Sequence, residues 1–154
     1  MKLSTKARYA VVAMIDIAKN QSKDTYISLF SISKRNDISV SYLEQLFIKL
    51  RKANLEISIK GSKGGYRLAK LDNEIFVSDI IVAVDEKIEL LRCKDSGSGC
   101  IKKDKLCESH DLWGNLMINI NDYLSSISLQ NIVSHNINQE KSTNNLGENN
   151  VIFK

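Results

Sequence analysis

Long apolar runs and paired cysteines are both missing from this chain of 154 residues. No stretch reaches about eighteen consecutive apolar residues, which excludes a transmembrane helix. Residues 1–20 are partly apolar, but Lys2, Lys6, Arg8 and Asp16 interrupt them, so they do not form the apolar core of a signal peptide. Cysteine occurs three times, an odd number within one short window, which does not make a disulfide framework. We therefore expect a soluble cytoplasmic protein without a membrane partner.

The signatures of catalysis are missing too. No glycine-rich phosphate loop follows a predicted strand, and the stretch GSKGG at residues 61–65 lies in a basic hairpin and is not a Walker motif. No cysteine–histidine–aspartate arrangement has an apparent pocket. We therefore expect a protein that is not an enzyme.

What the sequence does contain is a strong separation of charge. Residues 1–70 carry fourteen Lys and Arg against five Asp and Glu, a net charge of +9. Residues 71–154 carry eight against thirteen, a net charge of −5, and the two halves give the formal total of +4. By itself, this charge distribution is as consistent with unevenly scattered surface charge as with a binding function. A basic half joined to an acidic half nevertheless indicates a nucleic-acid-binding module attached to a segment with another role.

Residues 1–70 have the periodicity of three helices followed by a two-stranded hairpin. The helices are predicted at Ser4–Asn20, Ser28–Asn36 and Ser41–Ala53, with a turn at residues 37–39 before the third. In the third helix, Ser41 and Glu44 have the spacing of a capping box. Four apolar residues behind this box form one stripe: Leu43, Leu46, Phe47 and Leu50. This is the strongest helix signal in the chain.

The spacing of apolar residues changes to every second residue at Leu55–Lys60. Leu55, Ile57 and Ile59 alternate with polar residues, which predicts a strand whose apolar face is buried. The glycine-rich turn at residues 61–65 then lets Tyr66–Lys70 return as the partner strand. Helix, helix, turn, helix and hairpin is the order of a winged helix-turn-helix domain. We therefore predict a mainly α fold with a small β-hairpin wing, and a DNA-binding domain over residues 1–70.

A winged helix-turn-helix places its third helix in the major groove of double-stranded DNA, first turn nearest the bases. Gln45 can pair with adenine through two hydrogen bonds, serines match several base edges, and lysines and arginines suit phosphates. The predicted DNA contacts are Lys2, Arg8, Ser39, Ser41, Tyr42, Gln45, Lys49, Arg51, Lys52, Lys60 and Lys63. Each of these residues alone fits an ordinary solvated surface, but charge, motif order and the basic hairpin tip together favour DNA.

Residues 71–134 are predicted to form a second part of the protein. A short helix is expected at Ser78–Val84, whereas residues 85–106 show little periodicity, as functional or disordered segments do. A long helix follows at about Cys107–Ser126, and one or two further helical turns at residues 128–134. Its wide apolar face, with Leu116, Ile120 and Leu124 in line, predicts a homodimer through this helix. Residues 135–154 are polar and predicted to be a mobile tail.

All three cysteines and one of the two histidines lie within eighteen residues, at Cys93, Cys100, Cys107 and His110. Cys107 and His110 are three apart at the predicted helix start and would share one face. Three sulfurs and one nitrogen complete either a tetrahedral zinc site or the ligand set of an iron–sulfur cluster. The gaps between the cysteines hold six residues each, which is longer than usual zinc spacing. Cysteines on a mobile loop without metal are the remaining alternative, but the pattern favours a metal site.

Several motifs together resemble the IscR family of iron–sulfur-cluster regulators. They are MKLSTKARYAVVAMIDIA, SVSYLEQLFIKLRKANL, IKGSKGGYRLAK, and the three cysteines with His110 followed by Leu112 and Trp113. The resemblance runs from Met1 to about Ser134. It implies a homodimeric bacterial transcription factor with an N-terminal winged helix, a long dimerisation helix, and a 2Fe–2S cluster held by Cys93, Cys100, Cys107 and His110. The cluster would come from a donor of the iron–sulfur assembly machinery.

In that family the cluster-loaded form represses the genes for cluster assembly, while the cluster-free form still binds a second class of promoter. Glu44 matches the family's recognition-helix glutamate, which disfavours the first promoter class when the cluster is absent, so it joins the predicted DNA contacts. Lys60 stands where the family usually has an arginine, which keeps the charge but not the planar fork.

Two other functions remain as alternatives. The first is the related nitric-oxide-sensing repressor, which holds a 4Fe–4S cluster with three cysteines and an N-terminal acid. Arg8 stands where that acid is expected, and His110 supplies a nearer fourth ligand, so both residues argue against it. The second is a small iron–sulfur electron carrier or cluster-delivery protein, which would need neither the basic N-terminal half nor the wing.

Overall fold

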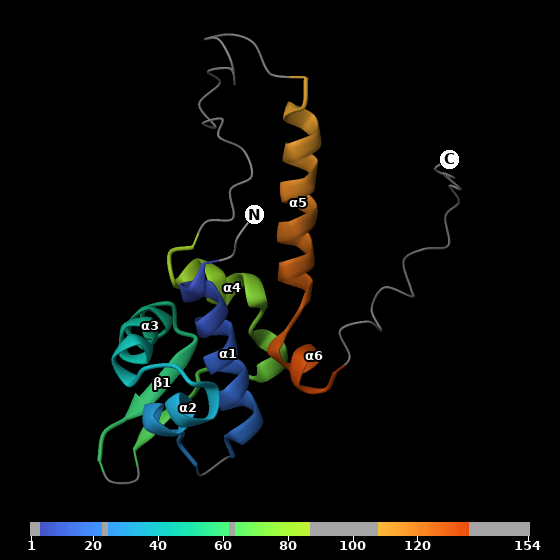
Figure 1. The fold of residues 1–154 in the computed structure, drawn as a ribbon. Helices are drawn as coiled ribbons and strands as arrows, with labels where there is room; N and C mark the ends of the chain where they lie inside the picture. Colours follow the sequence, from blue (N-terminus) through green and yellow to red (C-terminus); the bar gives the residue numbers. More distant parts are fainter. Residues whose placement is uncertain (1–3, 23–24, 62–63, 87–107, 136–154) are drawn as a thin grey trace.

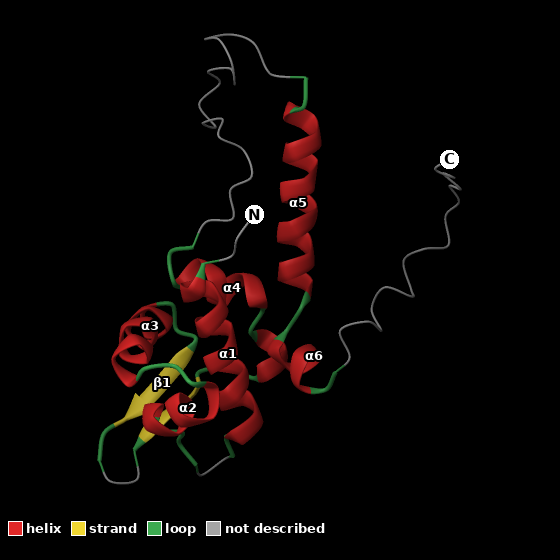
Figure 2. Ribbon diagram, viewed as in Figure 1, coloured by secondary structure: helices red, strands yellow, loops and turns green. Residues whose placement is uncertain are grey.

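The computed structural model describes residues 4–22, 25–61, 64–86 and 108–135 and is mainly helical (Figure 1). In chain order the elements are α1 (Thr5–Asn20), α2 (Leu29–Asn36), α3 (Val40–Lys52), β1 (Glu56–Ile59), β2 (Gly65–Leu68), the 3₁₀ helix η1 (Asp72–Glu74), α4 (Val77–Ala83), α5 (His110–Ser126) and α6 (Leu129–Val133). The two strands form the antiparallel hairpin seen in Figure 2. The predicted mainly α winged helix-turn-helix fold is therefore confirmed. No helix in these ranges is long and apolar enough to cross a membrane.

One apolar core joins the first three helices to the hairpin, α4 and α6. Buried members from these elements include Met14, Ile17, Ile32, Phe47, Leu68, Ile80 and Leu129. Removing a side chain of this size from water stabilises the fold by about 1.5–3 kcal/mol. The Leu129 N–H donates to the Ile75 carbonyl at 2.9 Å, which holds α6 beside the segment that leads into α4. The core of the winged helix thus draws on residues from well beyond position 70.

The turn between α2 and α3 corrects the expected start of the third helix. Asp37 adopts a left-handed conformation (φ 53°) at the end of α2, and Ser39 then caps α3 by accepting a hydrogen bond from the Tyr42 N–H. Ser41 and Glu44 already lie inside the helix, so the expected capping box between them is wrong. Ser39 is the N-cap because its backbone is extended and places it just before the first helical turn, where its side chain can accept a hydrogen bond from a free N–H.

The hairpin is held in place by the segment before α2. Ile27 and Tyr66 exchange two backbone hydrogen bonds, at 2.8 and 2.9 Å, which add a bridge to the edge of β2. Gly65 lies at this contact with φ 152°, and a Cβ there would lie only 2.8 Å from the Ile27 carbonyl oxygen. The close approach therefore requires glycine.

The predicted orientation of β1 is wrong. Leu55 is buried as expected, but Ile57 and Ile59 are 41% and 51% exposed. Glu56, from the opposite face, is instead buried at 1% exposure. The reason is that Leu55 precedes the regular strand, and the strand then turns its even-numbered face toward α3, where Arg51 supplies a partner for Glu56.

Helix α5 extends away from the rest of the described chain, as Figure 1 and Figure 2 show. None of its residues is buried, and Leu112, Trp113, Leu116 and Tyr123 are each at least 40% exposed. The helix begins at His110 after a turn at Glu108 and Ser109. The expected start at about Cys107 is therefore too early, and Cys107 itself lies outside the described residues, so its shared face with His110 stays a prediction.

The remaining elements lie close to their predicted positions. Helix α4 begins at Val77, where the Asp79 carboxylate accepts a hydrogen bond from the Phe76 N–H at 3.1 Å. Helix α6 provides the expected short turn before His135, and Ser128 caps it.

Candidate nucleic-acid interface

Helix α3 lies at the periphery of the domain, with one face in the core and the other in solvent (Figure 1). Its apolar stripe, Leu43, Leu46, Phe47 and Leu50, is buried as predicted. The opposite face is exposed and carries Ser41, Glu44, Gln45, Ile48 and Lys52. Hydroxyl, amide and carboxylate groups thus share an outward surface with a lysine. Such a surface can hydrogen-bond base edges and neutralise phosphate.

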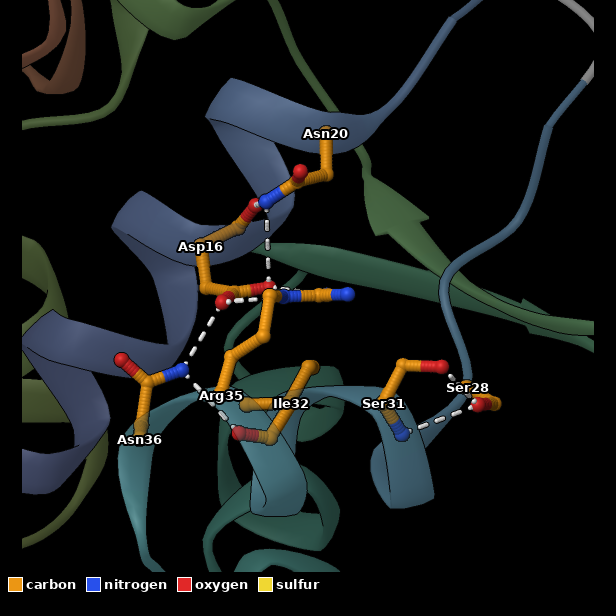
Figure 3. Close-up of polar contacts among 7 residues, drawn as sticks. All are labelled: Asp16, Asn20, Ser28, Ser31, Ile32, Arg35 and Asn36. Carbon is orange, nitrogen blue, oxygen red and sulfur yellow. Dashed lines mark hydrogen bonds and ion pairs between the residues drawn. The ribbon is translucent and has the colours of Figure 1, made fainter.

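Helix α2 is fixed to α1 by one buried carboxylate, that of Asp16 (Figure 3). Arg35 donates two hydrogen bonds to it, from Nε at 2.9 Å and Nη2 at 2.6 Å. The Asn36 amide adds a third at 2.8 Å, and Asn20 contributes from the following turn of α1. A paired guanidinium fork on a carboxylate fixes orientation as well as distance. The contact therefore sets the angle of α2, and with it the turn that leads into α3.

The charge state of Asp16 follows from these contacts. Burial raises the pKa of its carboxyl group, but the hydrogen bonds from Arg35 and Asn36 and the Arg35 charge outweigh burial. The net pKa of Asp16 therefore lies below its ordinary value, and the carboxylate stays ionised at neutral pH.

The end of α3 is joined to the wing by a second ion pair. Arg51 Nε donates to Glu56 Oε1 at 3.0 Å, and its guanidinium lies 5.7 Å from the centre of the Tyr66 ring on β2. Burial raises the pKa of Glu56 despite the neighbouring arginine, and Oε2 is the one buried side-chain oxygen or nitrogen in the described ranges without a hydrogen-bond partner. The Arg51 side chain is half exposed, so it binds Glu56 of the wing and also reaches the solvent-facing surface.

A third set of charges lies where α1, α3 and the end of α4 meet. Lys49 on α3 forms an ion pair with Asp85 at 2.7 Å, and Lys6 on α1 lies 4.0 Å from the Glu86 carboxylate. Lys6 and these two acidic residues are absent from the predicted contacts. No local sequence pattern points to them, because 79 residues separate Lys6 from Asp85.

The other predicted contacts have varied surroundings. Arg8 and Lys60 are exposed, and Tyr42 is half-buried with its ring edge-on to Tyr9 at 5.9 Å. Ser39 caps α3. Lys2 and Lys63 lie outside the described residues.

The predicted metal ligands fall almost entirely outside the described ranges. Cys93, Cys100 and Cys107 are not among the described residues, whereas His110 is the first residue of α5 and is half-buried. Within the part of the chain that the structure describes, no group of three or more His, Cys, Asp and Glu side chains is placed to hold a metal ion.

Comparison with known proteins places this architecture among transcription factors. Residues 3–135 match the family model Rrf2, described as an iron-dependent transcriptional regulator. The HTH-type transcriptional regulator IscR of Photorhabdus laumondii is 46% identical over 135 residues, covering 88% of this chain and 80% of that protein. The corresponding regulator of Vibrio parahaemolyticus is 43% identical over 136 residues, covering 88% of this chain and 79% of that protein.

Solved structures give the same result. T. potens IscR superposes with a TM-score of 0.71 at 31% identity, covering 96% of this chain and 94% of that one. CymR, the global cysteine regulator of B. subtilis, superposes with a TM-score of 0.74 at 32% identity, covering 88% of this chain and 98% of that one. These relatives are DNA-binding regulators and not enzymes, in agreement with the sequence prediction. The chain is therefore a member of the Rrf2 family of transcriptional regulators.

Proposed function

We propose that this protein is an iron–sulfur-cluster-sensing transcription regulator that binds promoter DNA as a homodimer and represses cluster-assembly genes when loaded with its cluster. The observation that carries the DNA-binding part is the exposed polar face of α3. Ion pairs fix this helix to the wing and to the end of α4, and a shared core packs it against α1. A rigidly held helix with polar residues outward is what major-groove recognition requires.

The residues of α3 divide into two roles in this proposal. Ser41 and Gln45 contact base edges, because their exposed side chains offer both donors and acceptors. Lys52 contacts the phosphate backbone about two turns further along the same face. The remaining proposed contacts are Lys2, Arg8, Ser39, Tyr42, Lys49, Arg51, Lys60 and Lys63, with the wing lysines directed to a neighbouring minor groove. Residues 1–70 provide this DNA-binding part.

Helix α5 is proposed to form the homodimer. Leu112, Trp113, Leu116 and Tyr123 are exposed in the single chain, and a second copy of the same helix would cover its apolar stripe. Residues 71–134 in this view combine the linking helix α4, the cysteine segment and the dimerisation helix, and residues 135–154 are a tail.

Cys93, Cys100, Cys107 and His110 are proposed to hold a 2Fe–2S cluster. Three thiolates and one imidazole are a fitting donor set for such a cluster. A bound cluster supplies a centre whose presence depends on iron and on delivery by the assembly machinery. The neutral imidazole of His110 adds no negative charge to that of the three thiolates, so we expect it to be the ligand most readily lost.

Glu44 is proposed to discriminate between promoters. Its carboxylate lies on the exposed face of α3 next to Gln45, where it repels phosphate or leaves a base edge unmatched. This penalty makes the cluster-free chain avoid the promoters of cluster-assembly genes.

The cluster proposal is tested by spectroscopy after anaerobic purification. Absorption and Mössbauer spectra should show a 2Fe–2S cluster in the wild type and its loss in Cys93→Ala. The variant Ser98→Ala, a change of similar size in the same segment, should keep the cluster. A colourless wild type, bound zinc or a 4Fe–4S spectrum would contradict the proposed cofactor.

The regulatory proposal is tested on a promoter of cluster-assembly genes. Cys93→Ala should lose binding in a mobility-shift assay, and Cys93→Ala/Glu44→Ala should recover it, because the carboxylate penalty is gone. Equal binding by the wild type and Cys93→Ala would show that the cysteines have no part in promoter choice.

A further inference from the structure

Two consecutive acidic residues at the end of α4 bind the basic ends of α1 and α3. The Asp85 carboxylate lies 2.7 Å from Lys49 Nζ on α3. The Glu86 carboxylate accepts a hydrogen bond from the Ser4 N–H at 3.2 Å, and it lies 4.0 Å from Lys6 Nζ. Lys6 also donates to the Asp85 carbonyl at 3.4 Å. Two carboxylates thus occupy neighbouring cationic positions on two different helices.

The groups that receive these carboxylates are the kind that bind phosphate. Ser4 caps α1, whose first turn holds no acidic residue, so the positive end of the helix dipole meets the anion there. Lys49 is one turn after Gln45 on α3 and is therefore close to the proposed base contacts. Backbone N–H groups at helix starts and lysine side chains are regular partners of the DNA backbone.

The charge environment of Asp85 supports an anion site. A hydrogen bond from Lys49 and the charges of Lys49, Lys6 and Lys52 hold the pKa of Asp85 below its ordinary value. The hydrogen bond from Ser4 and the charge of Lys6 likewise lower the pKa of Glu86. Lys6 on α1 and Lys49 and Lys52 on α3 therefore make the surroundings of Asp85 electropositive.

We propose that Lys6, Lys49 and the Ser4 N–H form a binding site for DNA backbone phosphate, which Asp85 and Glu86 occupy in the DNA-free chain. The acidic pair is an internal competitor of DNA, so its removal strengthens binding. This inference rests on the proposed DNA-binding function and adds a means of regulating it.

The competition is expected to be modest. The Asp85 side chain is 76% exposed, and ion pairs between exposed side chains are weak and screened by salt. Phosphate can therefore displace the carboxylate. Removing Asp85 should strengthen binding by about two- to fivefold at low salt.

The test compares Asp85→Asn with Asp122→Asn. Asparagine tolerates the left-handed backbone of Asp85 (φ 55°), so the fold is retained. Asp122 is exposed on α5 and its substitution changes the net charge equally. Affinity is measured by fluorescence anisotropy with a mixed-sequence DNA duplex at low salt, because backbone contacts do not depend on sequence. Asp85→Asn should bind about two- to fivefold more tightly than Asp122→Asn.

A Lys49→Gln background identifies the cation involved. Lys49→Gln should weaken DNA binding. In this background, Asp85→Asn should increase the affinity for DNA no more than Asp122→Asn does. Equal affinities of Asp85→Asn and Asp122→Asn, or an undiminished Asp85→Asn effect without Lys49, would overturn the site while leaving DNA binding intact. A wild type that binds no duplex at all would instead refute the proposed function itself.

Discussion

Gln45 and Lys52 lie on the same exposed face of α3 and are proposed to contact different parts of DNA. Gln45→Ala should cost about 1–3 kcal/mol at the cognate site and relax sequence preference, because a base contact is lost. Lys52→Ala should weaken all sequences alike, because phosphates are present in each. Binding of both variants to cognate and mixed-sequence duplexes checks this. If Gln45→Ala kept full sequence specificity, α3 would not be the recognition helix.

Burial makes the ionisation of Glu56 oppose folding. Its pKa is raised, so the folded state holds the proton more tightly than the unfolded chain. The stability from this group is therefore complete below its ordinary pKa of 4.5 and is lost as pH rises through the raised folded pKa. Glutamine does not ionise, so Glu56→Gln removes this loss of stability at higher pH.

The free energy of unfolding, measured by urea denaturation, should accordingly favour Glu56→Gln over the wild type more strongly at about pH 7.5 than at about pH 4.5. Comparing the two proteins at each pH cancels the opposite contribution of Asp16, whose lowered pKa adds stability above its ordinary value. A difference between variant and wild type that is the same at both pH values would mean that Glu56 does not titrate in this range.

At the scale of elements, α5 offers a matched pair of isoleucines. Ile120 lies in the apolar stripe with Leu116 and Tyr123, whereas Ile118 is on the opposite side of the helix and is 58% exposed. Ile120→Glu should give monomers by light scattering, because a charge in the middle of the stripe would be buried between two copies. Ile118→Glu should remain dimeric. Dimers of Ile120→Glu, or monomers of both variants, would contradict dimerisation through this stripe.

The connections between elements show where local sequence signals were incomplete. The helices of residues 1–70 were predictable because each has an apolar stripe and a serine near its start. Two serines precede the apolar stripe of α3, so the sequence does not distinguish Ser39 from Ser41 as its cap, and only the backbone conformation selects Ser39. Alternation along β1 defines two faces, and the location of Arg51 decides which of them is covered.

At the scale of the whole molecule, the sequence alone determined the element order, the winged helix-turn-helix fold, the charge separation and the cysteine pattern. These properties depend on local periodicity and composition, which the printed residues contain directly. Tertiary structure decided which distant charges meet, as in Asp16 with Arg35 and Lys49 with Asp85. It also decided that Ile75 and Leu129 complete the core of the DNA-binding part. Such contacts join residues far apart in the chain, so they follow from packing of the elements and leave no local pattern to read.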